Sequence, residues 1–323
     1  MALLAMAVID RGCEAISLTG SQAGIITTTD HSQAQIVEVR PVRVHEAIND
    51  GKVVIVGGFS GVSTDKEVTT LGRGGSDTTA IAMAAALEAA SCDIFSDVEG
   101  VYTADPRVVS EAQLIDRMSH GEILEMGLRG ARVLAPEAID YARRHNISLC
   151  ARSTFSEGRG TVITSAETPG LGRAVGVAGD TTALPCSFSG PESGLAILLE
   201  ALEHEGIPWK DVRLEGSGQT RQAELTLSTE NNPHYEAALV GIAAALGDAT
   251  QLSWRPDQAT VTVVGEGIAE RRACWEIARI TLQNMGVEAR SLRGSAWGIT
   301  AEVPRESLDS VVRSWHEAFP GLG

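Results

Sequence analysis

The stretch Thr70-Leu71-Gly72-Arg73-Gly74-Gly75-Ser76-Asp77-Thr78-Thr79 decides how the first half of this chain folds. An apolar, β-branched run precedes it at Lys52 to Phe59, and an alanine-rich run follows it at Ala80 to Cys92. The pattern predicts a strand, a glycine loop and the start of a helix, in that order. Because glycines lack a Cβ, the amides of such a loop and of the helix N-terminus can approach an anion closely.

The side chains of this loop suit a carboxylate or phosphate ligand. Arg73 offers a planar fork of hydrogen-bond donors that matches either group. Asp77 stands where we expect the helix N-cap, and a Ser-Asp pair after glycines is more often a cap than a functional pair. A second loop nearby in the sequence changes the balance between these two interpretations.

That second loop reads Ser96-Asp97-Val98-Glu99-Gly100-Val101-Tyr102-Thr103-Ala104-Asp105-Pro106-Arg107 and follows a β-rich stretch at Cys92 to Phe95. Two such loops after consecutive strands are expected at one edge of a parallel sheet, where open α/β proteins bind their ligands. The sequence therefore predicts a nucleotide site at this edge. Further helices are predicted at 2–12, 42–49, 120–127 and 136–145, and further strands at 14–18, 35–40, 147–151 and 161–164.

The two loops, together with Thr19-Gly20-Ser21-Gln22-Ala23-Gly24, resemble the core of the aspartokinases. These amino-acid-kinase family enzymes phosphorylate the β-carboxylate of aspartate. The resemblance runs densely to about Thr164 and more weakly to the C-terminus. It implies an amino-acid-kinase-like three-layer α/β/α sandwich over residues 1–170, with ATP, Mg²⁺ and L-aspartate as ligands.

The resemblance also implies roles for individual residues of this chain. Arg73 would grip a carboxylate of aspartate, and Asp77 would orient the phosphate-binding groups. The remaining substrate-side residues would be Thr19, Ser21, Gly74, Gly75 and Ser76, and the nucleotide-side residues would be Gly57, Gly58, Ser96, Asp97, Tyr102, Arg107 and Arg132. Arg132 stands where the family usually has a lysine. Taken singly, Tyr102 as a core residue or Arg107 as a helix cap is about equally plausible.

The front of the sequence departs from the family pattern. Aspartokinases begin with a strand that ends in a Lys-x-Gly-Gly segment, whose lysine neutralises the transferring phosphates, and this segment does not occur here. About 80 residues of a full domain, including a central strand, are absent relative to that motif. Three explanations remain open: a separate N-terminal or kinase subunit completes the fold, the sequence is a fragment, or the chain is a non-catalytic regulatory or assembly subunit.

The second half, residues 171–323, repeats a β-α-β-β-α unit after the turn Pro169-Gly170-Leu171-Gly172. Each copy fits a ferredoxin-like module. The repeat resembles the two ACT domains of aspartokinases, in which the strand at Arg173 to Val177 joins the second module, so that the modules interleave. Modules of this kind pair edge to edge, which predicts a homodimer.

Composition narrows the class of protein. The 323 residues are 43% hydrophobic and carry a net charge of −16, which argues against nucleic-acid and acidic-membrane partners because both need basic surface. No apolar run is long enough to span a membrane, and no signal peptide is recognisable, so we expect a cytoplasmic protein. Five scattered cysteines and seven unpaired histidines predict no metal site.

Overall fold

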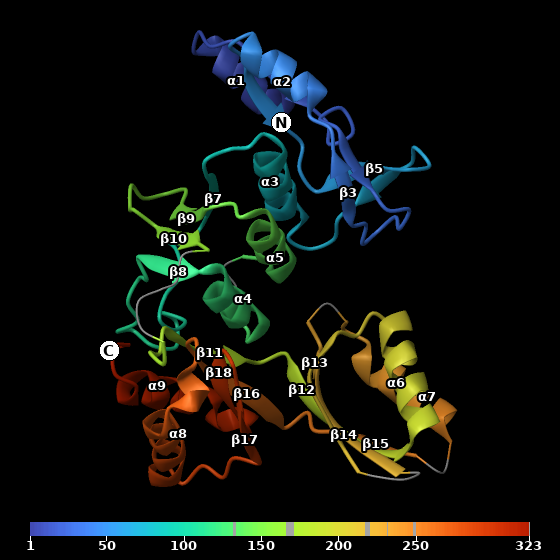
Figure 1. Ribbon diagram of the computed structural model, residues 1–323, viewed down its shortest axis with the longest axis vertical. Coiled ribbons are helices and arrows are strands. Elements are labelled where there is room, and N and C mark those ends of the chain that lie inside the picture. The colour runs from blue at the N-terminus through green and yellow to red at the C-terminus, as the bar shows by residue number, and fades with distance from the viewer. Residues whose placement is uncertain (132–133, 166–170, 217–219, 231, 248–249, 323) are drawn as a thin grey trace. The chain divides into compact units, whose positions relative to one another are not determined.

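The computed structural model describes residues 1–323 apart from 132–133, 166–170, 217–219, 231, 248–249 and 323 (Figure 1). The chain divides into two compact units. Unit 1 comprises Met1–Thr103, Gln113–Leu128 and Arg132–Leu171, and unit 2 comprises Ala104–Ala112, Arg129–Ala131 and Gly172–Gly323. Unit 2 thus takes in two short segments from the first half of the sequence, which no sequence pattern indicated.

Unit 1 alternates strands with helices. Its helices are α1 (Ala2–Asp10), α2 (Val42–Asn49), α3 (Gly75–Ala86), α4 (His120–Leu128) and α5 (Pro136–His145). Its strands are β1 (Ala15–Leu18), β2 (Ile25–Thr27), β3 (Ile36–Val39), β4 (Val53–Val56), β5 (Ser60–Ser63), β6 (Val68–Thr70), β7 (Cys92–Ser96), β8 (Arg117–Ser119), β9 (Leu149–Ser153) and β10 (Thr161–Thr164). The predicted bounds of α2, α5 and β10 are confirmed.

The strands of unit 1 form separate sheets rather than one. β1 pairs with β4 in parallel, the order β7-β9-β10-β8 forms a second sheet, and β3-β2-β5-β6 forms a third. The expectation that the strands before the two loops share one parallel sheet is wrong, because no described strand joins β4 to β7. Among the described residues, each of these two strands has a ladder partner on one side only.

Local signals explain why some helix ends were predictable. Helix α4 begins with a capping box, in which the Ser119 amide donates to Glu122 Oε2 at 2.8 Å and the Glu122 amide donates to Ser119 Oγ at 3.1 Å. Helix α5 has proline at its first position and basic residues in its last turn, and it ends at Asn146 in the left-handed conformation. Both devices satisfy amides or carbonyls that the helix itself leaves unpaired.

Unit 2 contains the predicted repeat. Its helices are α6 (Glu192–His204), α7 (Tyr235–Leu246), α8 (Arg272–Asn284) and α9 (Leu308–Ala318), with 3₁₀ turns at Ile268–Glu270 and Arg305–Ser307. Its strands are β11 (Gly176–Asp180), β12 (Ala183–Pro191), β13 (Trp209–Glu215), β14 (Thr220–Ser228), β15 (Gln251–Trp254), β16 (Gln258–Val264), β17 (Ser291–Ser295) and β18 (Gly298–Pro304).

These strands form two antiparallel sheets, ordered β13-β14-β12-β15 and β11-β16-β18-β17. Strand β11 precedes the first module in sequence but pairs with β16 of the second, as expected, although it begins three residues later than the predicted strand at Arg173 to Val177. Strand β15, which was not predicted, takes the corresponding place beside β12. Two ACT-like ferredoxin modules are therefore present: the first is continuous from β12 to β15, and the second takes in β11 from before the first.

Each module of unit 2 has its own apolar core. In the first, α6 and α7 cover one face of the sheet around Phe188 and Leu198 (Figure 1). In the second, α8 and α9 pack over residues that include the fully buried Trp315. Ala104 and Val109, from the segment Ala104–Ala112, are buried in this second core. The segment belongs to unit 2 because its apolar side chains lie there.

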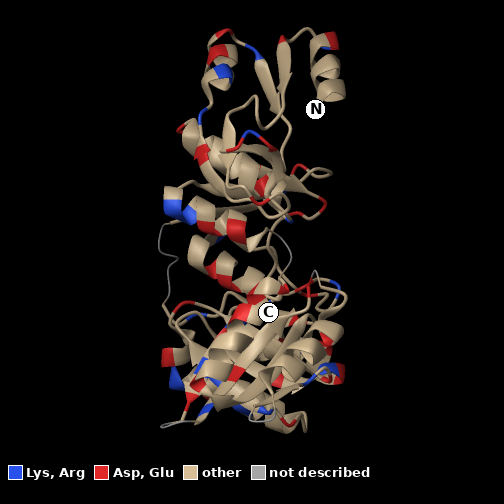
Figure 2. Cartoon of the chain, turned by 90° about the vertical axis from the view of Figure 1, so that its right-hand side faces the viewer, with Lys and Arg blue, Asp and Glu red and all other residues tan. Residues whose placement is uncertain are grey.

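Acidic residues outnumber basic ones in this chain. Asp and Glu number 42 against 26 Lys and Arg, and Figure 2 shows acidic residues on helices and loops throughout the chain. Within the described ranges, no helix combines the length and apolar character that a membrane crossing requires.

The capping box of α4 yields a stability prediction. Replacing Ser119 with Ala removes the acceptor of the Glu122 amide in a buried site, so we expect the free energy of unfolding to fall by about 1–2 kcal/mol. Urea unfolding followed by circular dichroism measures this loss. Ser110→Ala is the control, because Ser110 is hydrogen-bonded only to the neighbouring exposed Glu111, and a loss equal to that of Ser119→Ala would contradict the assignment.

Candidate active site

The candidate site of unit 1 lies where the loop that contains Gly57 and Gly58 meets the loop of residues 70–79. Strand β4 ends at Val56 and leads into Gly57 and Gly58. A Cβ on Gly58 would lie 3.3 Å from Ser76 Cα, tighter than most such contacts. The first loop therefore packs directly against the start of α3, and glycine at residue 58 allows that approach.

The loop of residues 70–79 makes its turn at Gly74. This residue is left-handed (φ +68°) and is the N-cap of α3, whose first turn contains Asp77. The predictions that Asp77 caps the helix and that the helix begins at Ala80 are thus wrong by three and five residues. Glycine takes the cap position because a Cβ there would lie 2.1 Å from Ala135 Cβ, a contact that no sequence feature announced.

Thr79, which the sequence interpretation overlooked, ties the two loops together. Its hydroxyl accepts a hydrogen bond from the Phe59 amide at 3.1 Å and donates one to the Gly75 carbonyl at 2.6 Å. It is buried, and Phe59 is held at a positive φ of 75°. A threonine in the second turn of a helix, whose hydroxyl can bond the carbonyl four residues earlier, could have signalled this role.

The turn Thr19 to Gln22 joins the same neighbourhood. The Thr19 amide donates to Gln22 Oε1 at 3.1 Å and the Gln22 amide donates to Thr19 Oγ1 at 3.2 Å, so the turn is closed on itself. Gly20 is required here because a Cβ would lie 1.8 Å from the Ser60 carbonyl oxygen. Thr19 and Ser21 are both exposed at the surface of this turn.

The charged groups of the loops differ in environment. Arg73 is exposed, whereas Asp77 is half-buried. Burial raises the pKa of Asp77 above its ordinary value of 3.8, although a hydrogen bond from Ser76 opposes the shift. The unpaired amides at the N-terminus of α3 suit an anion such as a phosphate, and the half-buried Asp77 carboxylate beside them suits a cation.

The acidic loop that begins at Ser96 is held by hydrogen bonds between its own residues. After β7, the Val98 amide donates to Ser96 Oγ at 3.3 Å. Tyr102 donates to Glu99 Oε2 at 3.1 Å, and burial together with Glu99 raises the pKa of the Tyr102 phenol. Asp97 is exposed in this loop. Ser96, Asp97 and Tyr102 are thus all in the surface segment where a ligand could reach them.

Two predicted nucleotide residues stand apart from these loops. Arg107 lies in the segment Ala104–Ala112 of unit 2, and its guanidinium holds the Asp105 carboxylate at 2.7 Å, which lowers the pKa of that carboxyl. Arg132 lies outside the residues that the structure describes. Their roles stay predictions.

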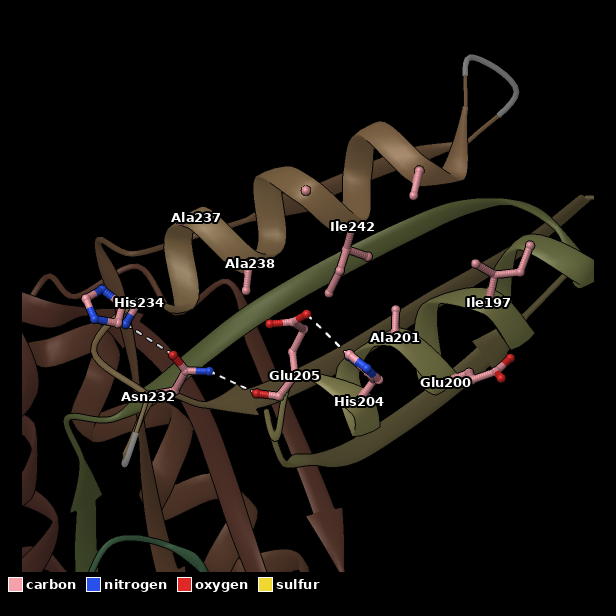
Figure 3. A pocket seen from close by; sticks show the side chains of 12 residues that line it. Ile197, Glu200, Ala201, His204, Glu205, Asn232, His234, Ala237, Ala238 and Ile242 are labelled. Carbon is pink, nitrogen blue, oxygen red and sulfur yellow. Dashed lines mark hydrogen bonds and ion pairs between the residues drawn. The ribbon is translucent and has the colours of Figure 1, made fainter.

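A hollow in unit 2 is a separate feature. A cavity of about 720 Å³ lies between α6 and α7, and Figure 3 shows Ile197, Ala201, Ala238 and Ile242 directed toward it from the two helices. Asn232 Nδ2 donates to the Glu205 carbonyl at 3.2 Å at one end of it. Its lining combines small and apolar side chains with polar ones, among which His204 Nδ1 lies 3.5 Å from Glu205 Oε1.

Comparisons of the sequence and of the structure with known proteins identify the same kind of relative. The sequence profile of the Amino acid kinase family matches residues 1–152. The chain is 37% identical over 332 residues to the aspartokinase of Mycolicibacterium smegmatis and 38% identical over 335 residues to that of Mycobacterium tuberculosis. Both alignments span 100% of this chain and 78% of the relative. The structure resembles that of E. coli aspartokinase III in complex with aspartate and ADP, with a TM-score of 0.80 at 25% identity over 98% of this chain and 72% of that one.

The raised pKa of Asp77 predicts how stability changes with pH. A carboxyl whose pKa is higher in the folded than in the unfolded state destabilises the fold as pH rises through that interval, and the loss persists above it. Asparagine has no such loss. We therefore expect Asp77→Asn to have a higher unfolding midpoint than the unmodified chain at pH 7, with the difference disappearing below about pH 4. Thermal unfolding across this pH range tests it, and a pH-independent difference would contradict it.

Proposed function

The chain belongs to the aspartokinase family, and on this premise we propose that unit 1 transfers the γ-phosphate of ATP to the β-carboxylate of L-aspartate. A carboxylate oxygen of aspartate attacks the γ-phosphorus, the bond to the bridging oxygen breaks, and 4-phospho-L-aspartate and ADP form. The reaction is the first step toward the aspartate-derived amino acids. The observation that carries the proposal is the approach of Gly58 to Ser76 at the start of α3.

This approach supports phosphoryl transfer because the reaction needs positioning and charge neutralisation more than covalent chemistry. The two loops present backbone without side chains on one side and the positive end of a helix on the other. Arg73 would bind a carboxylate of aspartate, with Thr19, Ser21 and the Gly74 turn around it. Asp77 would orient the groups that hold the transferring phosphate.

The nucleotide would lie along the loop after β7. We propose that Ser96 and Asp97 bind it, that Tyr102 packs beside it, and that Arg107 and Arg132 contribute positive charge. Arginine in place of the family's usual lysine at residue 132 keeps the charge with a broader, planar shape. The exposure of Asp97 and of the Arg107 guanidinium supports their availability to a ligand.

Mg²⁺ is the cation we propose for this site. Among the described residues, no three His, Cys, Asp or Glu side chains gather to hold a metal. That suits Mg²⁺, which is usually held by substrate phosphates and one or two carboxylates instead of a full protein cage. When bound, it neutralises charge between the β- and γ-phosphates. Asp77, in the first turn of α3, would be a carboxylate facing it.

A complementing N-terminal or kinase subunit would explain the open strands of unit 1. β4 and β7 each lack a partner on one side in the described structure, and α1 exposes Leu3 (81%) and Met6 (61%). Unpaired strand edges and exposed apolar helices invite another polypeptide. The same observation favours a second candidate function, a non-catalytic regulatory or assembly subunit that pairs with an intact kinase.

We further propose a homodimer formed through the ACT modules. Strand β13 is at the end of its sheet and exposes Val212 (43%) and Leu214 (57%). An apolar edge strand pairs readily with the same strand of a second copy.

The five cysteines are all free, three of them buried, which is compatible with a reducing compartment such as the cytoplasm.

The kinase proposal predicts acyl phosphate, which hydroxylamine traps as a hydroxamate. With Mg-ATP and L-aspartate, we expect product from the purified chain and a fall of at least about 100-fold for Asp77→Ala, because a group acting on the transferring phosphate is lost. Asp65→Asn, on an exposed turn of the same unit, should leave the rate unchanged.

Each other outcome has a definite meaning. Equal activity in Asp77→Ala and the unmodified chain would remove Asp77 from the site. Absence of product from the chain alone, with an increase when it is mixed with an intact aspartokinase, would favour the subunit function. No product from the chain alone, together with no change in the rate of the intact aspartokinase when the chain is added, would reject the kinase proposal and the subunit proposal together.

The dimer proposal predicts a specific effect of charge at the β13 edge. Leu214→Lys places like charges on facing strands, so we expect the dimer dissociation constant to rise at least about tenfold in sedimentation velocity. Val240→Lys is the matched control, because Val240 is equally apolar and 59% exposed but lies on α7. Equal dissociation of both variants, or of neither, would exclude this edge.

A further inference from the structure

The acidic loop that begins at Ser96 is tied at two points to the hairpin loop of residues 154–160, which joins β9 to β10. Strands β7 and β9 are parallel and end together, with Ser96 paired with Ser153 (Figure 1). Directly after this pair, the Thr154 amide donates to the Ser96 carbonyl at 2.8 Å. Further along, the Val101 amide donates to the buried Thr161 hydroxyl at 2.8 Å. The two loops therefore lie beside each other within unit 1.

Both ends of the hairpin loop are fixed. Gly160 has a positive φ of 70°, and a Cβ there would lie 2.2 Å from the Ala151 carbonyl oxygen, so glycine is required where the chain enters β10. At the other end, the Phe155 amide donates to Ser153 Oγ at 3.0 Å. Phe155 thus directly follows the point at which the two loops are joined.

The ring of Phe155 is open to solvent. Its exposed fraction is 83%, the largest among the large apolar side chains of the described residues. Single exposed apolar residues are common on protein surfaces, so exposure by itself does not indicate a site. The position of Phe155 does, because it lies beside the loop that we propose for the nucleotide. Val98 of that loop is also partly open, at 37% exposure.

A ligand held by the acidic loop would lie within reach of this ring. Neighbouring strands are about 4.8 Å apart, and both loops follow the carboxyl ends of parallel strands, where α/β proteins bind ligands. An aromatic side chain easily spans that separation. The flat face of a nucleotide base stacks on such a ring, whatever the identity of the base.

The charges of the two loops indicate which end of ATP belongs here. Asp97 and Glu99 of the acidic loop are exposed carboxylates, while Glu157 and Arg159 of the hairpin loop balance each other. A negatively charged surface repels a triphosphate but not an uncharged base. A carboxylate also accepts hydrogen bonds from ribose hydroxyls. The adenosine end of ATP therefore fits these loops better than the phosphate end.

We propose that Phe155 is a specificity-determining residue for the nucleotide: the adenine base of ATP stacks on its ring while Ser96 and Asp97 hold the ribose. The inference rests on the proposed function for the identity of the nucleotide. It gives the hairpin loop a part in the site, and it accounts for an aromatic ring left in water. Loss of the ring should weaken binding of the base and leave binding of the phosphates unchanged.

Calorimetric titration of the purified chain with two probes tests this separation. For Phe155→Ala, we expect the Kd of Mg-ATP to rise at least about fivefold, because a base-stacking contact is lost. The Kd of magnesium tripolyphosphate, which has the phosphates without a base, should change less than about twofold. Phe155→Trp keeps a ring for stacking, so its Kd for Mg-ATP should stay within about twofold of that of the unmodified chain.

Phe95→Ala is the matched control. Phe95 is also aromatic, is 60% exposed and directly precedes Ser96. The alternation along β7 directs its side chain to the face opposite that of Ile94 and Ser96, so its loss should not change ATP affinity. Equal losses in Phe95→Ala and Phe155→Ala would overturn the inference. Thermal unfolding checks that both variants fold.

Tryptophan fluorescence gives a second readout that does not depend on catalysis. All five tryptophans of the chain lie in unit 2, so Phe155→Trp introduces a reporter into unit 1. A stacked adenine should quench the added emission, measured against the unmodified chain, whereas tripolyphosphate should not. Emission that is unchanged at saturating ATP would reject stacking on this ring.

The binding data also separate this inference from the proposed function. If Phe155→Ala weakens ATP binding but the unmodified chain forms no hydroxamate, the base site stands and the kinase proposal fails. If hydroxamate forms with the same KM for ATP in both proteins, the base site is rejected and the kinase proposal stands. No ATP binding by the unmodified chain rejects both. Unchanged ATP affinity with weaker self-association in Phe155→Ala would assign the ring to a protein contact and reject the base site.

Discussion

The structure of unit 1 depends on how closely two glycine loops can approach each other. Gly58 meets Ser76 at the start of α3, and the Thr79 hydroxyl holds Phe59 of one loop and Gly75 of the other. A methyl group at Gly58 would press on the helix, and one at Gly74 would collide with Ala135. Because these contacts involve backbone, they cannot be relieved by a change of rotamer. The candidate site exists only while this packing holds.

Unit 2 joins two similar modules, each of which has its own apolar core. Strand β11, which precedes the first module, completes the sheet of the second, and β15, which lies between the two modules in sequence, completes the sheet of the first. Arg255, which follows β15, links Glu302 of one sheet to Glu224 and Ser187 of the other. The modules are therefore connected by charged groups at their junction and by β11, without which the sheet of the second module lacks one strand.

The sequence predicted some elements to the residue and missed others for identifiable reasons. Helices α2 and α5 and strand β10 have clear local boundaries, such as Pro136 at the first position of α5. The start of α3 was misplaced because Ser76 and Asp77 are typical capping residues, while the true cap is a left-handed glycine chosen by contact with Ala135. Short strands such as β2, β5 and β6 were missed because three or four residues give too little periodicity to detect.

By itself the sequence determined the glycine loops, the acidic loop after β7, the repeated module and the family to which these belong, since each is written in neighbouring residues. Only the tertiary structure decided that Gly58 meets Ser76, that Ala104–Ala112 and Arg129–Ala131 join unit 2, and that Asp211 accepts hydrogen bonds from Arg129 and Arg293. Arg129 and Arg293 each lie 82 positions from Asp211 in the sequence. Contacts at such separation depend on how whole sheets pack, which no local pattern of hydrophobic or charged residues encodes.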